Sequence, residues 1–532
     1  MDFLRRIFYP QQGKIDTELT MESSLVCPRE NTVEELANIL DCERVVHVRG
    51  TPASGKSMLA GLLVAYYRNR KIPVIYKNTW PQEFVPCYNK LFVHMFRENG
   101  YDFDIRDYLF TQDVAIILDE AQMSYGADDL WLGLIKSQSG NRYGPRIAIF
   151  TSYGSPTKGP EMDPMPGSPL AFLGPQQRVS ITPSIVGFSP KIALFYNREE
   201  FDDVVFRYCH DVTSLLKLDD GASDYLFSLT NGHPGAVNGI LNMLQNVYRS
   251  DLKRDMDAVR EADIRKTLED KNKAFAFLEQ TPVQRSFVDL KNLNPHAANT
   301  LRKVLIEGSM PRDLDNEGVR ICYERGWLHT EPLDVQANEI ICVLPTKLHA
   351  KFVEYNLADP KVKFPREKYP DIEALAEATL RQFSRRNMRA VSRYGAGAII
   401  RPLEATYQDE FYRSLHTVLG YAMDVTSEWS PDGVGRIDFR LGSVGWGIEV
   451  LREGDRLHEH CQRFTTRGTY GKWIQEGLLQ DWLVIDCRAT SPRPYEIPDT
   501  KLWRAVFAPD FSAVEVRNQY NQVVVDRFAL TE

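Results

Sequence analysis

The chain has 532 residues, of which 43% are hydrophobic and 26% charged, and its formal net charge is −8. This length exceeds what one hydrophobic core supports, so several domains are expected. The ordinary composition excludes a disordered or collagen-like chain. The negative charge excludes a globally basic nucleic-acid binder but leaves a local basic face open.

The cysteines and the N-terminus indicate the cellular compartment. The eight cysteines are scattered and form no C-x-x-C pair, which argues against a zinc site or a disulfide framework. No apolar run follows Arg5 and Arg6, so a signal peptide is not predicted, and no stretch of about 18 apolar residues predicts a membrane span. We therefore expect an intracellular protein.

Further along, Thr32 and Glu35 form a capping-box pattern that predicts a short helix beginning there.

The most specific motif is a glycine-rich loop between an apolar strand, residues 45–49, and a helix, residues 58–67. It fits the pattern G-x-x-x-x-G-K-[ST] at every fixed position. The loop consists of Gly50, Thr51, Pro52, Ala53, Ser54, Gly55, Lys56 and Ser57. Backbone N–H groups of such loops and the N-terminus of the next helix bind phosphates. We expect Lys56 to reach the β- and γ-phosphates of ATP and Ser57 to hold Mg²⁺.

Two further strands end in polar residues. The first ends in Asp119 and Glu120. Beside a phosphate-binding loop, Asp119 is expected to hold Mg²⁺ and Glu120 to polarise the attacking water. The second ends in Thr151 and Ser152, and ligands lie at the carboxyl ends of parallel strands. Thr151 or Ser152 is therefore a candidate contact to the γ-phosphate or the water, with an ordinary strand-end hydroxyl as the alternative of equal weight.

The middle of the chain is predicted to be mainly helical. Its turn Gly232-His233-Pro234-Gly235 opens a helix. A Gly-x-Pro turn here resembles the sensor segment of STAND and related AAA-like ATPases, which implies that His233 lies near the nucleotide. A helix-initiating turn without a ligand is the alternative. Residues 318–345 predict a helix, a turn and a hairpin, which is winged-helix-like; in STAND-type chains such a module usually packs on the ATPase.

The predicted segments follow in chain order. They are a lead-in over 1–43, a P-loop NTPase core over 44–187, a helical lid over 188–270, a winged-helix-like module over 271–358, a linker over 359–372 and a last domain over 373–532. The core includes a long surface loop rich in Gly and Pro over 153–176. Amphipathic patterning predicts a helix over 86–108. The fold class of the core is α/β, with an AAA/STAND-like parallel sheet.

The last domain begins with the most basic stretch of the chain. Residues 373–400 are predicted to form one helix, and no acidic residue interrupts the sequence from Arg381 to Arg401. Phosphate contact with DNA is one interpretation of this basic helix. A solvated helix face is the alternative, with even weight.

Two strands that follow carry Asp438 and Glu449, and the helix before them carries Glu410. This order resembles the restriction-endonuclease-like fold, whose motif is an Asp, a hairpin and then Glu-x-Lys. The resemblance implies that Asp438 and Glu449 hold Mg²⁺ for DNA cleavage, with Glu410 as a third ligand. A hairpin with two solvent-facing acids is the competing interpretation.

The sequence departs from that motif at the lysine position, which is Leu451. Arg452 follows one residue later and is expected on the opposite strand face. A local bulge would bring Arg452 to the site as a catalytic residue. Lys472 or Tyr470 are alternative replacements.

As a whole, residues 40–532 look like the Crinkler (crinkling- and necrosis-inducing) effector family and its retrotransposon-hot-spot relatives. The shared features are the glycine loop, the Gly-His-Pro-Gly turn and the terminal segments 436–439, 446–454 and 459–464. The resemblance implies an ATPase fused to a Mg²⁺-dependent endodeoxyribonuclease, with ATP and Mg²⁺ as cofactors, DNA as partner, a nuclear location and cell-death induction. The Leu-Phe-Leu-Ala-Lys header of the family is not found, which favours an ordinary intracellular role over delivery into a host.

The predicted function is thus a nucleotide-gated nuclease. One alternative is a STAND-like signalling switch whose last domain binds DNA or protein without cutting. Another is an ATP-driven remodeller of proteins. Assembly into a homo-oligomer is left open.

Overall fold

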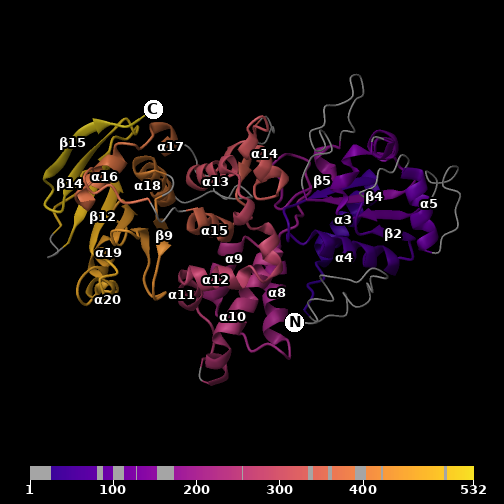
Figure 1. The fold of residues 1–532 in the computed structure, drawn as a ribbon, viewed down its shortest axis with the longest axis horizontal. Helices are drawn as coiled ribbons and strands as arrows, with labels where there is room; N and C mark the ends of the chain where they lie inside the picture. The colour runs from indigo at the N-terminus through magenta and orange to yellow at the C-terminus, as the bar shows by residue number, and fades with distance from the viewer. Residues whose placement is uncertain are drawn as a thin grey trace. The chain divides into compact units, whose positions relative to one another are not determined.

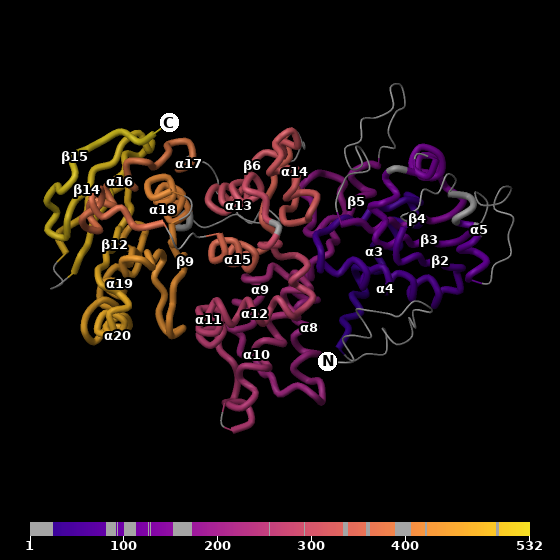
Figure 2. Tube along the Cα trace, viewed as in Figure 1, coloured from indigo at the N-terminus to yellow at the C-terminus, as the bar shows by residue number. Residues whose placement is uncertain are grey.

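The computed structural model describes residues 25–80, 88–99, 113–127, 129–152, 173–254, 256–333, 339–357, 362–389, 403–420, 423–495 and 500–531. The chain path is shown as a ribbon in Figure 1 and as a Cα trace in Figure 2. It divides into two compact units. Unit 1 comprises Met1–Val259, Phe277–Val288 and Pro311–Lys347, and unit 2 comprises Arg260–Ala276, Asp289–Met310 and Leu348–Glu532.

A five-stranded parallel sheet forms the centre of unit 1 (Figure 1). In spatial order its strands are β2 (Val74–Lys77), β3 (Ala115–Leu118), β4 (Arg146–Thr151), β1 (Val45–Arg49) and β5 (Arg178–Val179). Strands β3 and β4 are fully buried, as expected for a parallel sheet covered on both faces. The predicted α/β class with a parallel sheet is confirmed.

Helices cover this sheet and continue along unit 1. Helix α3 (Glu30–Glu43) packs against α4 (Lys56–Asn69), and both contact the sheet, as does α5 (Tyr88–Glu98). Residues 100–108 of the helix predicted over 86–108 lie outside the described residues. The later elements of unit 1 are η2 (Ala121–Gly126), η3 (Asp129–Ile135), α7 (Lys136–Gln138), η4 (Pro175–Gln177), α8 (Arg198–His210), α9 (Asp220–Thr230), α10 (Pro234–Arg254), η5 (Pro282–Ser286), α14 (Glu317–Glu324), β7 (His329–Pro332) and β8 (Ile340–Val343).

The start of α3 differs from the prediction. The helix begins at Glu30, and Arg29 before it is left-handed with φ 50°. Thr32 lies inside the helix, where its hydroxyl donates to Glu200 instead of capping the N-terminus. The reason is tertiary: the buried Arg29 guanidinium donates to the Leu194 carbonyl at 3.0 Å and to Glu200 at 3.0 Å, which fixes the chain at this point.

A seven-stranded mixed sheet forms the centre of unit 2. Its order is β15-β14-β13-β12-β11-β10-β9; β11, β12 and β13 are parallel, and the other neighbours are antiparallel. The strands are β9 (Val425–Trp429), β10 (Ile437–Leu441), β11 (Trp446–Arg452), β12 (Asp481–Arg488), β13 (Leu502–Phe507), β14 (Ala513–Asn518) and β15 (Val523–Ala529). The helices of unit 2 are α11 (Glu261–Glu269), η6 (Leu290–Asn292), α13 (Pro295–Glu307), α15 (Lys347–Leu357), α16 (Ile372–Leu380), α17 (Arg385–Arg389), α18 (Leu403–Leu419), α19 (Leu457–Arg463) and α20 (Gly471–Gln475). At the unit boundaries lie α12 (Lys271–Leu278) and β6 (Met310–Pro311).

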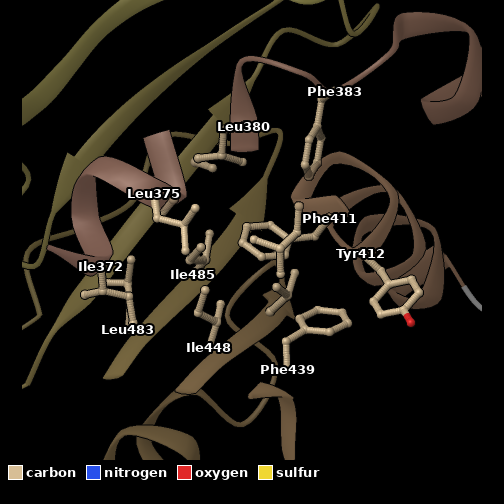
Figure 3. Packing of buried hydrophobic residues seen from close by; sticks show 14 of the residues in the cluster. Ile372, Leu375, Leu380, Phe383, Phe411, Tyr412, Phe439, Ile448, Leu483 and Ile485 are labelled. Carbon is tan, nitrogen blue, oxygen red and sulfur yellow. The ribbon is translucent and has the colours of Figure 1, made fainter. Parts of the chain in front are cut away.

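Alternation along the strands gives this sheet two apolar faces. On one face, Ile448 and Ile485 pack with Leu375 of α16 and with Phe411 of α18, whose ring stacks on that of Phe439 at 5.6 Å (Figure 3). The opposite face carries a second core. Its members come from β11 and β12 and from the segment that holds α19 and α20, and they include Leu451, Val484, Cys461, Phe464, Tyr470 and Trp473. Residues one apart on β11 therefore face different cores.

The helix predicted over 373–400 is wrong in its extent. Helix α16 ends at Leu380, and the short α17 follows after a break. At the break Phe383 is fully buried, and the Ser384 N–H donates to the Glu410 carboxylate. A continuous helix cannot make these contacts, so core packing overrides helix propensity. Residues 390–402 lie outside the described residues. Among the described helices, none is long and apolar enough to cross a membrane.

Candidate nucleotide site and carboxylate pair

The glycine loop leaves β1 and enters α4 at Gly55, whose φ of 90° favours glycine. Lys56 is buried, and its ammonium donates to the carbonyl oxygens of Gly50 at 3.1 Å and Thr51 at 2.9 Å. Burial lowers the pKa of Lys56, and the negative charges of Glu120 and Asp119 oppose that shift. The loop thus holds a desolvated cation beside two carboxylates.

Asp119 lies at the end of β3 and is also buried. Burial raises the pKa of Asp119, and a hydrogen bond from the Ser57 hydroxyl lowers it. Two oxygen ligands from different elements therefore meet beside the loop. This donor set fits Mg²⁺, which takes one or two protein oxygens and completes its shell with water and phosphate.

Glu120 follows directly, in the left-handed region with φ 47°. Its Oε2 accepts from Gln122 Nε2 at 2.8 Å and from the Ser152 hydroxyl at 3.4 Å. The Ser152 N–H in turn donates to Gln122 Oε1 at 3.3 Å. Gln122 thereby links the ends of β3 and β4. The sequence alone did not indicate Gln122, because its role depends on the turn that Glu120 makes.

Thr151 occupies a different place from its neighbour Ser152. Its hydroxyl is fully buried, lies 2.7 Å from His47 Nε2 and accepts from the Tyr125 hydroxyl at 3.0 Å. Burial lowers the pKa of His47 to about 3, so this ring is neutral. Thr151 and Ser152 were both candidates to contact the attacking water. Only the Ser152 hydroxyl approaches Glu120. His47 and Tyr125 were not foreseen.

The turn around His233 packs directly on the glycine loop. The Gly235 N–H donates to the Ala53 carbonyl at 3.1 Å, and a Cβ on Gly55 would lie 3.1 Å from Pro234 Cγ. The His233 ring is buried, and its Nδ1 accepts from the Ala236 N–H at 3.1 Å. Burial lowers the pKa of His233 to about 3, and the charge of Lys56 adds to that shift.

The α14–β7 turn also contacts the loop within unit 1. Gly326 has φ +71°, and a Cβ there would lie 2.6 Å from Pro52 Cδ. Arg49, at the end of β1, donates to the Tyr323 hydroxyl at 3.2 Å and to the Thr330 carbonyl at 3.1 Å. Residues of the glycine loop are thus held from two sides, by the His233 turn and by the Gly326 turn.

The strand order and the loop define the class of unit 1. Strand β4 lies between the glycine-loop strand β1 and the acid-tipped strand β3, as in the AAA-like branch of P-loop NTPases. With a complete glycine loop and acids at the end of β3, unit 1 has the P-loop NTPase fold.

Comparisons with known proteins add little. No family model matches the chain, and no curated protein matches it. Among solved structures, the Walker-type ATPase PABY2304 of Pyrococcus abyssi is 14% identical, with a TM-score of 0.35 over 61% of this chain and 95% of that chain. A RuvB mutant of Thermotoga maritima is 12% identical, with a TM-score of 0.31 over 59% and 91%. Drosophila ORC bound to DNA is 12% identical, with a TM-score of 0.27 over 65% and 94%. TM-scores this low carry no weight beside the strand order of the chain itself.

In unit 2 the structure brings Asp438 and Glu449 together. The antiparallel register pairs Phe439 with Ile448, so one step further places Asp438 opposite Glu449 on the same sheet face. Asp438 Oδ2 accepts from the Val450 N–H at 2.8 Å. Burial raises the pKa of Asp438 to about 7, and the negative charge of Glu449 contributes. Two carboxylates that repel each other favour a cation between them.

Glu449 is buried and has several partners. Its Oε1 accepts from the Tyr470 hydroxyl at 2.5 Å, and its Oε2 lies 2.7 Å from His460 Nδ1. Arg463 Nη1 lies 3.8 Å from Oε1. Of these three, the sequence pointed only to Tyr470, as a replacement for lysine. The i, i+3 spacing of His460 and Arg463 on the helix after Glu449 places both on one helix face, and this was a sequence signal by which they could have been found.

The other predicted residues lie elsewhere. The buried Glu410 carboxylate accepts from the Ser384 N–H and from Asn387 Nδ2, and pairs with Arg413. The charge of Arg452 acts on Tyr407 of α18, on the face opposite Glu449. Among the described residues no group of three or more His, Cys, Asp or Glu forms a metal site. Asp438 and Glu449 therefore supply a two-carboxylate set, which Mg²⁺ accepts when phosphate oxygens complete its shell.

The described arginines of the basic stretch are mostly paired. Arg381 binds Glu377 at 2.7 Å, and Arg385 binds Asp510 at 2.7 Å. Arg386 is exposed. Arg393 and Arg401 lie outside the described residues. Ion pairing weakens this segment as a free phosphate-binding face.

The Gly326 contact yields a test. We expect Gly326→Ala to lower thermal stability and weaken ATP binding, because the added Cβ meets Pro52. Gly477→Ala is the matched control, since Gly477 also has φ +71° but nothing lies within 4 Å of an added Cβ. Backbone strain of about 1–2 kcal/mol is common to both, and the clash adds about 1–3 kcal/mol at Gly326 alone. Thermal melts and titration with a fluorescent ATP analogue measure the difference. Equal losses in both variants contradict the contact.

The buried His47 yields a pH test. Its folded pKa of about 3 lies below the unfolded value of 6.5. The unfolded chain therefore takes up this proton first, and stability falls as the pH drops from 6.5 toward 3. Between pH 7.5 and pH 5.5 the loss from His47 is about 1.4 kcal/mol. His47→Gln keeps a hydrogen-bonding side chain and removes this part of the pH dependence. Urea unfolding at both pH values checks it, and an unchanged pH dependence in the variant is the contrary outcome.

Proposed function

We propose that unit 1 binds and hydrolyses ATP. The observation that carries this is the convergence of Lys56, Ser57, Asp119 and Glu120 at one end of a parallel sheet. A glycine loop alone binds phosphate, whereas a loop with a lysine, a Mg²⁺ ligand pair and a further carboxylate suits phosphoryl transfer.

The residues have distinct roles in this proposal. On binding, Lys56 exchanges its bonds with the Gly50 and Thr51 carbonyls for phosphate oxygens. Ser57 and Asp119 would hold Mg²⁺, which would neutralise phosphate charge. Glu120 accepts a proton from water as the water oxygen attacks the γ-phosphorus and the bond to the β-phosphate oxygen breaks. Gln122 and Ser152 keep the Glu120 carboxylate aimed at that water.

The loop contacts support a switch. Pro52 touches the Gly326 turn, and Gly55 touches the Pro234 turn. A change in the loop on binding or hydrolysis moves both turns, because neither contact has free space. We propose that the nucleotide state is read out through these two turns.

Two variants test the ATPase. Lys56→Ala is expected to abolish binding of a fluorescent ATP analogue. Glu120→Gln is expected to keep binding and to lower kcat by about 10²–10⁴-fold. Phosphate release and analogue titration measure the two effects. Glu98→Gln, at an exposed glutamate of α5, is the matched control. Hydrolysis by Glu120→Gln at the wild-type rate would falsify the role of Glu120.

A second candidate function is Mg²⁺-dependent cleavage of DNA by unit 2. It is favoured by the opposition of Asp438 and Glu449 on β10 and β11. The element order α18, β9, β10, β11, α19, α20, β12 is also that expected of a restriction-endonuclease-like fold. Leu451 at the lysine position supports the rival, a switch that binds DNA or protein without cutting.

Plasmid degradation with Mg²⁺ or Mn²⁺ separates these two candidates. We expect Asp438→Asn and Glu449→Gln each to lose cleavage by at least about 10²-fold, because each removes a metal ligand. Asp455→Asn, at an exposed aspartate nearby, is the control. Loss in Lys56→Ala as well indicates that the nucleotide gates cutting. Cleavage that survives both Asp438→Asn and Glu449→Gln comes from a contaminating nuclease. If the wild type hydrolyses ATP but does not cut DNA, the result supports the rival function, a switch that binds DNA or protein.

The resemblance to Crinkler effectors motivates the most specific proposal, that the protein is cytotoxic and acts in a nucleus. Expression of wild type and Glu449→Gln in a eukaryotic cell, with imaging of the tagged protein, tests it. Cell death that depends on Glu449 and nuclear signal are the expected results. Survival with cytoplasmic signal favours the ordinary intracellular role.

A further inference from the structure

The carboxylate pair of unit 2 lacks the cation that a Glu-x-Lys motif provides. Leu451 holds that position and is 2% exposed within an apolar cluster with Val484 and Leu502. A bulge does not restore Arg452, because the register of β11 with β12 runs without a shift from Trp446 to Arg452. The cation must therefore come from another element.

Lys472, the lysine of α20, does not supply it. Its side chain is 68% exposed, and its Nζ lies 3.8 Å from Glu476, the residue that follows the helix. Tyr470 reaches Glu449 but is a neutral donor, and burial raises its pKa further above the ordinary value. Neither residue places positive charge at the pair.

Helix α19 brings a guanidinium to the pair. Arg463 Nη1 lies 3.8 Å from Glu449 Oε1 and 3.2 Å from His460 Nδ1. Its Nη2 donates to Glu459 at 2.7 Å. The side chain is 23% exposed, so the guanidinium is not sealed from solvent.

The loop before α19 fixes where this helix begins. Glu453 and Arg456 have positive φ values of 50° and 41°, in a region that non-glycine residues avoid. The Gly454 N–H donates to the buried Asp486 carboxylate at 2.7 Å, and Glu453 accepts from the Ala489 N–H at 2.7 Å. These bonds hold a strained connection between Glu449 and Arg463. Such strain persists only where surrounding contacts enforce it.

We propose that Arg463 is the cationic residue of the unit 2 site, contacting the scissile phosphate of DNA in place of the missing lysine. This rests on the proposed nuclease function. A guanidinium stays protonated at all working pH values and matches two phosphate oxygens in its plane. Arg463 therefore stabilises charge and does not take a proton.

The reaction it assists is hydrolysis of a phosphodiester. Water attacks the phosphorus and forms a new P–O bond while the bond to the leaving sugar oxygen breaks. The attacking water loses a proton to solvent, and the leaving oxygen gains one, so a phosphomonoester and a hydroxyl result. Arg463 is placed to stabilise the extra negative charge on the phosphoryl oxygens between these two events.

The test compares Arg463→Met and Arg463→Lys with Arg467→Met, which removes an exposed arginine four residues on. We expect Arg463→Met to lose plasmid cleavage by about 10²-fold or more, Arg463→Lys to recover part of it, and Arg467→Met to cut like wild type. Binding of a fluorescent duplex in Ca²⁺ is the second readout, and we expect it to weaken in Arg463→Met more than in Arg467→Met.

Glu459→Gln separates a role in chemistry from a role in stability, because it breaks the surface ion pair and keeps the guanidinium. We expect this variant to cut like wild type. If Arg463→Met and Glu459→Gln lose thermal stability and cleavage together, the residue is structural and the inference is wrong. If Glu449→Gln abolishes cleavage while Arg463→Met cuts normally, the nuclease stands and only Arg463 is refuted. If wild type never cuts, both proposals fall.

Discussion

The nucleotide site depends on the burial of one ammonium group. Removal from water lowers the pKa of Lys56, while the Gly50 and Thr51 carbonyls accept hydrogen bonds from its Nζ and the charges of Glu120 and Asp119 oppose the shift. The Gly326 and Pro234 turns pack against the loop from two sides.

A comparable constraint governs unit 2. Burial, with the negative charge of Glu449 on the adjacent strand as the second cause, raises the pKa of Asp438 to about 7. Polar groups of α19 and the segment after it surround Glu449: the Tyr470 hydroxyl donates to its carboxylate, and His460 Nδ1 lies 2.7 Å from Oε2. In both units, therefore, the candidate carboxylates lie beside polar groups that come from other elements.

The sequence predicted the parts of these sites that local patterns determine. The glycine loop and Asp119 follow from fixed spacing, and the opposition of Asp438 and Glu449 follows from hairpin register. It did not predict the helix break at Phe383 or the hydrogen bond from the Ser384 N–H to Glu410. Both arise from core packing between segments that are separated in the chain. The inward direction of the Thr151 hydroxyl likewise depends on His47 and Tyr125, which no motif connects.

The interleaved composition of unit 2 has a consequence for how such a chain is acquired or lost in evolution. Segments before residue 348 complete this unit: the Ser430 N–H donates to Glu269 at 3.2 Å, and Gly433 has no room for a side chain because the Ala262 carbonyl occupies that space. A gene fragment that encodes residues 373–532 alone lacks both partners. Recombination at a single linker would thus transfer an incomplete unit 2. We therefore expect the two units to be inherited together and not exchanged as independent domains.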